Sequence, residues 1–168
     1  MARCTPRLKA DRIMAEAPRQ NRPPSIKALN DATQLAQLHG LAFVDGAWSK
    51  SAFADFLAQK TVTALGHQDG FILLQNLPDG VEILTLAVHP DKRRRGLARR
   101  LMAHMMTALR PAKIWLDVAA DNYPAQALYS GFGFIEYGRR SKYYKRAGNS
   151  AIDAVLMRLD MQEGVTNG

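Results

Sequence analysis

The chain has 168 residues, of which 47% are hydrophobic and 23% charged, and its formal net charge is +8. This length and balance predict one globular domain, and the single cysteine excludes an intramolecular disulfide framework. The positive charge attracts anions, and it fits nucleic acid, the ribosome or a polyphosphate cofactor equally well.

Residues 1–24 are rich in arginine and contain no apolar core segment, which argues against a secretory signal. We predict a disordered basic leader over 1–24, a single domain over 25–162 and a flexible tail over 163–168. No apolar run approaches the roughly 20 residues that cross a bilayer, so no membrane contact is expected. Together with the lone Cys4, these features predict a reducing, cytoplasmic location.

The first half of the domain is expected to form four strands and two helices. A short strand over 25–29 precedes a helix that Asn30 is placed to cap, and Ser49 is placed to cap a second helix. Proline and glycine in Leu77–Gly80 indicate a turn, so residues 70–88 are expected to form an antiparallel hairpin. The three later strands are expected over 61–65, 70–75 and 81–88.

The second half begins with a polar loop over 89–96 and a helix whose apolar face carries Leu97, Leu101, Met105 and Leu109. A nearly continuous apolar strand follows over 113–119, then a helix capped by Asp121 or Asn122, then strands over 134–144 and 151–159. The order βααβββαβαββ, with a right-handed crossover between the strands at 81–88 and 113–119, predicts a mixed sheet with helices on both faces.

The segment Arg93-Arg94-Arg95-Gly96-Leu97-Ala98 follows a strand and opens a helix. Free amides at a helix start, a glycine that lets a ligand approach the backbone, and fixed positive charge together suit a pyrophosphate. The same residues also fit a solvated basic turn. The segment lacks the Gly-Lys-Ser/Thr ending of phosphotransferase loops and the Gly-x-Gly-x-x-Gly pattern of dinucleotide-binding folds.

Val88-His89-Pro90-x-x-Arg93-Arg94-x-Gly96-x-Ala98 resembles the pyrophosphate-binding signature of the GNAT superfamily of N-acetyltransferases. Residues 116–122 resemble the second parallel strand of that family, and Ala127-Leu128-Tyr129-x-x-x-Gly133-Phe134 resembles its helix and glycine turn. Residues 139–157 and Trp48-Ser49 are similar to the subfamily of bacterial ribosomal-protein-alanine N-acetyltransferases. The likeness covers roughly residues 25–160.

The resemblance implies a sheet of six or seven strands in which two central parallel strands splay apart around acetyl-CoA. No metal site is expected, because the four histidines show no ligand spacing. By the same resemblance, the coenzyme would contact Leu86, Ala87, Val88, Arg93, Arg94, Arg95, Gly96, Leu97, Ala98, Arg99, Asn122 and Tyr129. Asn122 also fits a plain helix cap.

The resemblance further implies direct attack of an amine on the thioester, with Tyr129 as the acid and Asp117 at the position of the family's glutamate base. Aspartate is one methylene shorter than glutamate, so we expect Asp117 to act through a water molecule. The alternatives are a packed aromatic for Tyr129 and a structural carboxylate for Asp117. Glu136 is a weaker candidate for the base.

The acceptor implied by the resemblance is a peptide or protein N-terminus, and in particular the N-terminal alanine of a ribosomal protein. Trp48, Arg140, Tyr143 and Tyr144 are expected to line its entry, although the tyrosines also fit packing against the sheet. Two alternatives stay open. One is an acetyltransferase for a small-molecule amine or amino acid, and the other is a non-catalytic ribosome- or RNA-binding module. Nucleic acid is not expected as the substrate.

Overall fold

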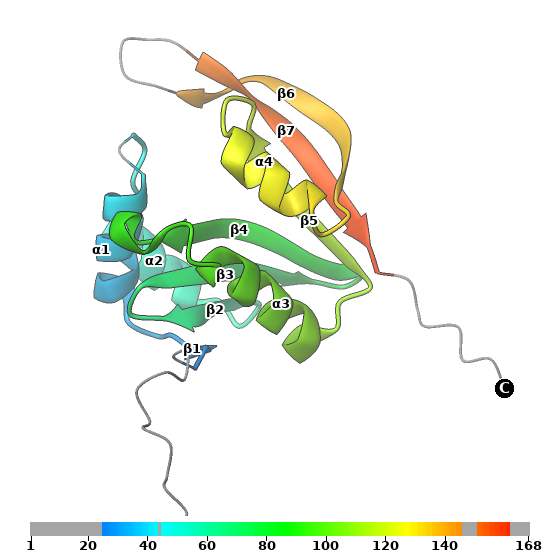
Figure 1. Cartoon of the computed structure of the whole chain (residues 1–168). Coiled ribbons are helices and arrows are strands. Elements are labelled where there is room, and N and C mark those ends of the chain that lie inside the picture. Colours follow the sequence, from blue (N-terminus) through cyan, green and yellow to red (C-terminus); the bar gives the residue numbers. More distant parts are fainter. Residues whose placement is uncertain (1–24, 44, 146–150, 162–168) are drawn as a thin grey trace, which may run out of the picture.

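The structure, a computed structural model, describes residues 25–43, 45–145 and 151–161 (Figure 1). Strands and helices follow one another in the predicted order βααβββαβαββ. The predicted leader over 1–24 and tail over 163–168 lie outside the described residues, as does residue 162, so the predicted domain limits stay predictions.

The first half of the described chain closely follows the expected pattern. Asp31, and not Asn30, caps α1, because its Oδ1 accepts from the main-chain N–H of Thr33 at 2.8 Å. Ser49 caps α2 as predicted. The elements are β1 (Lys27–Ala28), α1 (Ala32–Ala42), α2 (Lys50–Ala58), β2 (Val62–His67), β3 (Gly70–Leu77) and β4 (Gly80–Val88).

In the second half, Asn122 is the residue that caps α4, through a bond from the Ala125 N–H to its Oδ1 at 3.3 Å. A short 3-10 turn precedes α3 and was not expected from the sequence. The elements are η2 (Pro90–Lys92), α3 (Leu97–Leu109), β5 (Lys113–Ala119), α4 (Tyr123–Ser130), β6 (Ile135–Lys145) and β7 (Ala151–Asp160).

The strands form one open seven-stranded sheet in the order β1-β2-β3-β4-β5-β7-β6, and β4–β5 is its parallel pair. In Figure 1, α3 and α4 lie in front of the sheet, and α1 and α2 lie at the left on its other side. Successive residues of β3 alternate between the two resulting cores, because side chains point to opposite faces of a strand. Ile72 and Leu74 pack under α3, whereas Phe71 and Leu73 pack under α1 and α2.

The parallel strands β4 and β5 pair at three positions only, and the last pair is Ile83 with Leu116. Beyond it, β4 continues to Val88 and β5 to Ala119 without pairing with each other. On the other edge of β4, the register with β3 shifts so that Leu84 is an extra residue, a β-bulge that bends its strand. The predicted splay of the two central strands is therefore confirmed.

A cluster of aromatic rings joins α1 to α2 around His39, whose side chain is buried. The His39 ring stacks on Phe43 at 4.4 Å and on Trp48 at 5.1 Å between centroids. Its Nδ1 accepts the main-chain N–H of Trp48 at 3.1 Å, so this nitrogen carries no proton. Burial lowers the pKa of His39 from 6.5 to about 4.

Gly80 lies where β4 and β5 begin to pair, and Gly80→Ala should disturb that contact. An added Cβ would overlap the carbonyl oxygen of Lys113 and lie 2.7 Å from the ring of Trp115. We expect the free energy of unfolding to fall by about 2 kcal/mol, as for an overpacked core.

Gly40→Ala is the matched control, because a Cβ on Gly40 in α1 meets nothing within 4 Å. It should stabilise the protein by roughly 0.5–1 kcal/mol, since alanine favours helix. Equal urea-denaturation midpoints for the two variants would contradict this account.

The neutral state of His39 predicts a pH-dependent stability. Above pH 6.5 its contribution is fully present, because neither the folded nor the unfolded state binds a proton there. As the pH falls from 6.5 to about 4, only the unfolded state binds the proton, so stability is lost. The loss should reach roughly 3 kcal/mol at the lower limit. The free energy of unfolding, measured by urea titration at several pH values in this window, should fall less steeply with pH in His39→Asn than in the wild type. An equal dependence on pH in the two proteins would contradict the assignment.

Candidate active site

The turn before α3 leaves main-chain N–H groups open at the start of the helix. Gly96 caps α3 in the left-handed conformation, with φ 77°, and no side-chain hydrogen bond caps the helix. The first N–H groups of a helix have no partner within it, and they lie at the positive end of the helix dipole. A Cβ on Gly96 would meet no atom within 4 Å, so the space before the turn is open. This geometry suits an anion such as a phosphate.

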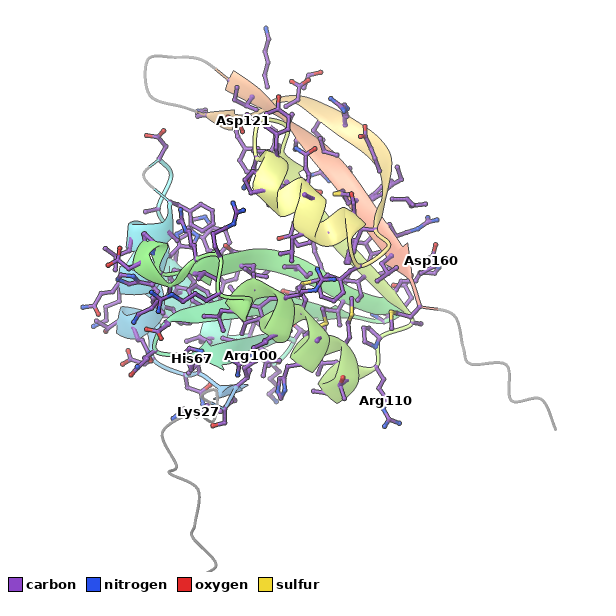
Figure 2. All side chains as sticks on the ribbon, viewed as in Figure 1. Lys27, His67, Arg100, Arg110, Asp121 and Asp160 are labelled. Atoms are coloured by element: carbon purple, nitrogen blue, oxygen red, sulfur yellow. The ribbon has the colours of Figure 1, made fainter. Side chains whose placement is uncertain are left out.

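The arginines of this segment point their charge in different directions. Arg94 and Arg95 are exposed. The Arg99 guanidinium lies over the Phe132 ring at 5.1 Å, which joins α3 to the turn after α4. The Arg93 side chain bonds to main-chain carbonyls instead. Arg100 lies beside His67, whose pKa is lowered by burial and also by the Arg100 charge. Figure 2 shows both residues far from Asp121 at the start of α4. The side chains of Arg93 and Arg99 thus contact other parts of the protein, so the segment offers an anion mainly the open main-chain N–H groups after Gly96.

The end of β4 supplies the second predicted coenzyme contact. Ala87 is buried under α1 and α2, whereas Leu86 and Val88 pack toward α3. On the side of β5, this part of β4 has no strand partner among the described residues. Its main-chain groups can therefore bond an extended ligand that enters between the two strands.

Tyr129 belongs to the core on the face of the sheet that α3 and α4 cover, together with Val118 of β5 and the partly buried Leu86 and Val88 of β4. It is 7% exposed and packs on Phe134, with 5.7 Å between ring centroids. Burial raises the pKa of the Tyr129 hydroxyl, and the nearby Tyr144 raises it further. The hydroxyl is therefore protonated at neutral pH, as a proton donor must be.

Asp117 faces the opposite side of the sheet. Its neighbours Leu116 and Val118 belong to the core under α3 and α4, so the alternation of β5 turns Asp117 away from them. Its Oδ2 accepts from Arg140 Nη1 at 2.9 Å, and the Asp117 side chain is 18% exposed. This ion pair brings the predicted base and the predicted acceptor residue Arg140 together.

Sequence reasoning missed a second carboxylate in this site, Glu82. It pairs with Trp115 in the parallel register, which places it on the same face as Asp117. Burial raises the pKa of Glu82, the Asp117 carboxylate raises it further, and Arg140 opposes both effects. Glu82 is the one charged residue of β4, and this lone charge in an apolar strand was the available signal.

The end of β6 reaches back over this site. Three residues of β6, 141–143, lie opposite a single residue of β7, and Lys142 adopts φ 53°. This irregularity brings Tyr144 to β5, where its hydroxyl donates to the Asp117 carbonyl at 3.2 Å. Tyr143 is 51% exposed and lies 5.4 Å from the Arg140 guanidinium. Tyr144 is thus a neighbour of both Asp117 and Tyr129, while Trp48 lies in the aromatic cluster between α1 and α2.

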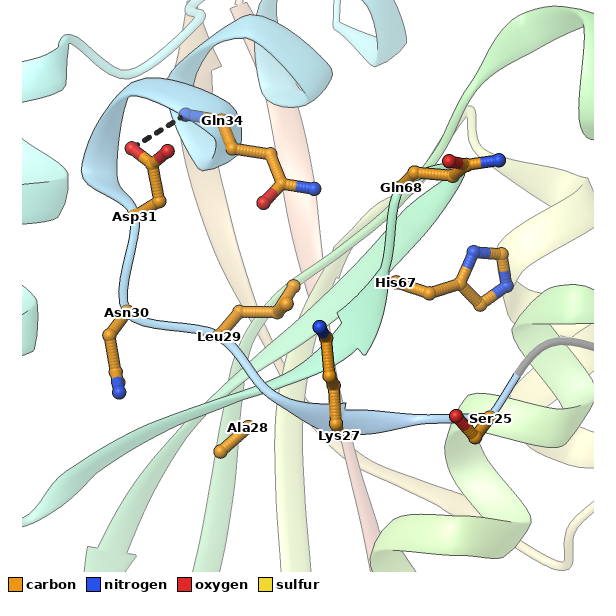
Figure 3. Close-up of a pocket in the computed structure, with 9 residues that line it drawn as sticks. All are labelled: Ser25, Lys27, Ala28, Leu29, Asn30, Asp31, Gln34, His67 and Gln68. Atoms are coloured by element: carbon orange, nitrogen blue, oxygen red, sulfur yellow. Dashed lines mark hydrogen bonds between the residues drawn. The ribbon is translucent and has the colours of Figure 1, made fainter.

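A separate pocket lies away from this site. An open pocket of about 700 Å³ lies at the β1 edge, between Lys27, Asp31, Gln34 and Gln68 (Figure 3), and none of the predicted site residues lines it. We place the candidate site at the splayed strands, because Asp117 lies on β5 just beyond the last paired position and the open helix start follows the end of β4. Within the described ranges no cluster of three metal-ligating side chains occurs. No helix in the described part of the chain is long and apolar enough to span a membrane.

Comparison with known proteins agrees with this geometry. The model of the Acetyltransferase (GNAT) family matches residues 29–134. The N-alpha-acetyltransferase RimI of Mycobacterium tuberculosis is 33% identical over 150 residues, which cover 82% of this chain and 93% of that protein. The [ribosomal protein bS18]-alanine N-acetyltransferase of Escherichia coli is 34% identical over 119 residues, covering 67% and 80%.

Solved structures show the same relationship. The crystal structure of the ribosomal-protein-S18-alanine N-acetyltransferase from Escherichia coli has a TM-score of 0.75 and 28% identity, covering 86% of this chain and 97% of that one. Arabidopsis thaliana NAA60 in complex with a bisubstrate analogue has a TM-score of 0.69 at 21% identity, covering 82% and 99%, and shares the fold. The chain belongs to the GNAT acetyltransferase family and is an N-acetyltransferase.

Proposed function

We propose that the protein transfers the acetyl group of acetyl-CoA to the α-amine of a peptide or protein N-terminus, with the N-terminal alanine of a ribosomal protein as the favoured acceptor. The observation that carries this proposal is a buried, protonated tyrosine, Tyr129, on one face of the sheet and the carboxylates of Glu82 and Asp117 on the other face, next to the point where β4 and β5 separate. Relatives named for alanine N-acetylation of ribosomal protein bS18 support the choice of acceptor.

The residues present fit the coenzyme. The open N–H groups after Gly96 suit its diphosphate, and the side of Leu86–Val88 that has no strand partner suits its extended pantetheine arm. Asn122 caps α4 through Oδ1, which leaves its amide NH₂ as a donor at the same opening. Acetyl-CoA, when bound, supplies the thioester acetyl group and a thiol leaving group.

The acid and the base lie on opposite faces of the sheet. An α-ammonium must lose a proton before its nitrogen can attack a carbonyl, and the leaving sulfur must gain one. The acceptor-side carboxylates, Glu82 and Asp117, take the proton of the ammonium, and Tyr129 Oη holds the proton that the sulfur receives. The second proton of the nitrogen leaves as the amide bond forms and restores the proton that Tyr129 gave to the sulfur, and the carboxylate releases the first proton to solvent. An α-amine has a pKa of about 7.7–8.0, so a base with a raised pKa suffices.

Between the two carboxylates, Glu82 has the better properties for a base. Asp117 is bound to Arg140, whereas Glu82 makes no hydrogen bond or ion pair among the described residues. Asp117 was the base predicted from the sequence, and it raises the proton affinity of Glu82 by its charge. We therefore propose a carboxylate pair in which Glu82 receives the proton and Asp117 supports it.

Two carboxylates on the acceptor side would also suit a small cationic amine, and this is the second candidate acceptor. Membership of the N-acetyltransferase family argues against the alternative of a ribosome- or RNA-binding module without turnover. A cytoplasmic location stays part of the proposal, in line with the single cysteine in the leader.

The acceptor is tested by thiol release from acetyl-CoA. We expect release with a peptide that begins with alanine, much less with free alanine or a polyamine, and none with the same peptide blocked at its N-terminus. Thiol release with small amines but not with the peptide would contradict the proposal that a peptide N-terminus is the acceptor.

Tyr129→Phe tests the acid in the same assay. Because the variant lacks the hydroxyl proton but keeps the packed ring, kcat should fall about 100-fold or more while the Kd for coenzyme A stays unchanged. Unchanged kcat would show that Tyr129 is not the acid.

The pH dependence of kcat tests the carboxylate pair. A base works above its pKa, so the wild-type rate should fall as the pH drops through the raised pKa of Glu82. Glu82→Gln should remove this acidic limb and lower kcat at neutral pH by about 10- to 100-fold. Asp117→Asn removes a repelling charge, so it should move the limb to lower pH. If Asp117→Asn removes the limb and Glu82→Gln leaves it, the proton goes to Asp117 instead.

A further inference from the structure

The side chain of Arg93 spans two segments that are distant in sequence. Its Nη2 donates to the carbonyl of Ala42, 51 residues away, at 2.9 Å. Its Nε donates to the carbonyl of Val88 at 3.3 Å. Ala42 is the last residue of α1, and Val88 is the last residue of β4. One guanidinium therefore joins α1 and the opening of the sheet to the turn that leads into α3.

This arrangement has a clear physical basis. The last carbonyls of a helix lack partners within it and lie at the negative end of the helix dipole. A guanidinium offers several donors in one rigid plane, so it can serve two carbonyls at once. Lysine, with one ammonium on a flexible stem, cannot hold both in the same way. Arg93 is exposed like its neighbours Arg94 and Arg95, and it differs from them because its side chain donates to two main-chain carbonyls.

The contact continues from α1 to the aromatic cluster. The N–H of Phe43, the residue after Ala42, donates to the His39 carbonyl at 2.9 Å. His39 in turn accepts the N–H of Trp48, and its ring stacks on Phe43 and Trp48. The end of α1 and Trp48 are thus parts of one packed unit, which Arg93 holds against the turn before Gly96.

We propose that Arg93 is a positioning residue that couples the coenzyme-binding turn to the acceptor side, through the end of α1 and Trp48. This inference rests on the proposed function, which places the diphosphate at Gly96, and on the expectation from the family resemblance that Trp48 lines the entry of the acceptor. Ligand binding at one end of a shared unit changes affinity at the other, and the effect is reciprocal. Coenzyme A held at the turn should therefore stabilise the last turn of α1.

Amide hydrogen exchange tests the coupling without turnover. In the wild type, coenzyme A should slow exchange of the amides at residues 40–43. In Arg93→Ala these amides should exchange faster and should no longer respond to coenzyme A, while α3 still does. Lys92→Ala is the matched control, because it removes one positive charge from the same loop without removing either bond, and it should respond as the wild type does. An α1 response in Arg93→Ala equal to that of the wild type would overturn the proposal.

Steady-state kinetics give a second test. Arg93→Ala should raise KM for an alanine-start peptide by about five- to tenfold, the lower range of coupling between sites. Its Kd for coenzyme A should match that of Lys92→Ala at the same salt concentration. Arg93→Lys keeps the charge but cannot hold both carbonyls, so it should recover the KM only in part. A Kd that rises in Arg93→Ala alone, with KM unchanged, would identify Arg93 as a phosphate ligand and refute the coupling.

The two tests separate this inference from the proposed function. Exchange coupling without acetyl transfer to any amine would leave the link through Arg93 standing and remove the proposed function. Acetyl transfer by a wild type whose α1 does not respond to coenzyme A would do the reverse.

Discussion

The separation of β4 from β5 is the constraint on which the site depends. Two parallel strands normally continue to bond along their length, and here the pairing stops at Ile83 and Leu116. The extra residue Leu84 on β4 bends that strand while its other edge stays bonded to β3. The result is a gap in the middle of the sheet, and within the described residues the strand ends that face it have no strand partner across it. A ligand that bonds to those groups restores part of what the sheet has lost, and the open helix start after Gly96 lies at the mouth of the gap.

The reactive groups lie on two different faces of the sheet. Tyr129 belongs to the core under α3 and α4, whereas Glu82 and Asp117 project from the other side of the sheet. A tyrosine hydroxyl that faced a carboxylate directly would donate its hydrogen bond to that carboxylate. Held on opposite sides, each keeps the protonation state that the proposed reaction needs. Arg140 balances one of the two carboxylates, so the acceptor side keeps about one net negative charge, which suits a cationic amine.

Much of this architecture follows from the sequence, because it depends on local patterns. The order of the elements, the hairpin over 70–88, the parallel crossover and the glycine turn before α3 were all predicted correctly. Asn30 was the wrong cap for α1, since an asparagine and an aspartate stand side by side and both cap helices well. The roles of the site residues stay proposals.

What the sequence could not supply depends on distant contacts. Glu82 becomes a neighbour of Asp117 only through the register of β4 with β5. The ion pair of Asp117 with Arg140 spans 23 residues and depends on the order β5-β7-β6. Arg93 looked like one more positive charge for a phosphate, yet its donors are directed to Ala42 and Val88. Such partners are fixed by tertiary packing, which periodicity and spacing do not encode.

A crystal structure of the protein with a conjugate of coenzyme A and an alanine-start peptide would test the central claim most directly. We expect the sulfur of the conjugate to lie between β4 and β5 within hydrogen-bonding distance of Tyr129 Oη, with the alanine nitrogen on the side of Glu82 and Asp117. A conjugate whose peptide leaves through the face covered by α3 and α4, or whose sulfur lies outside the gap, would contradict the account.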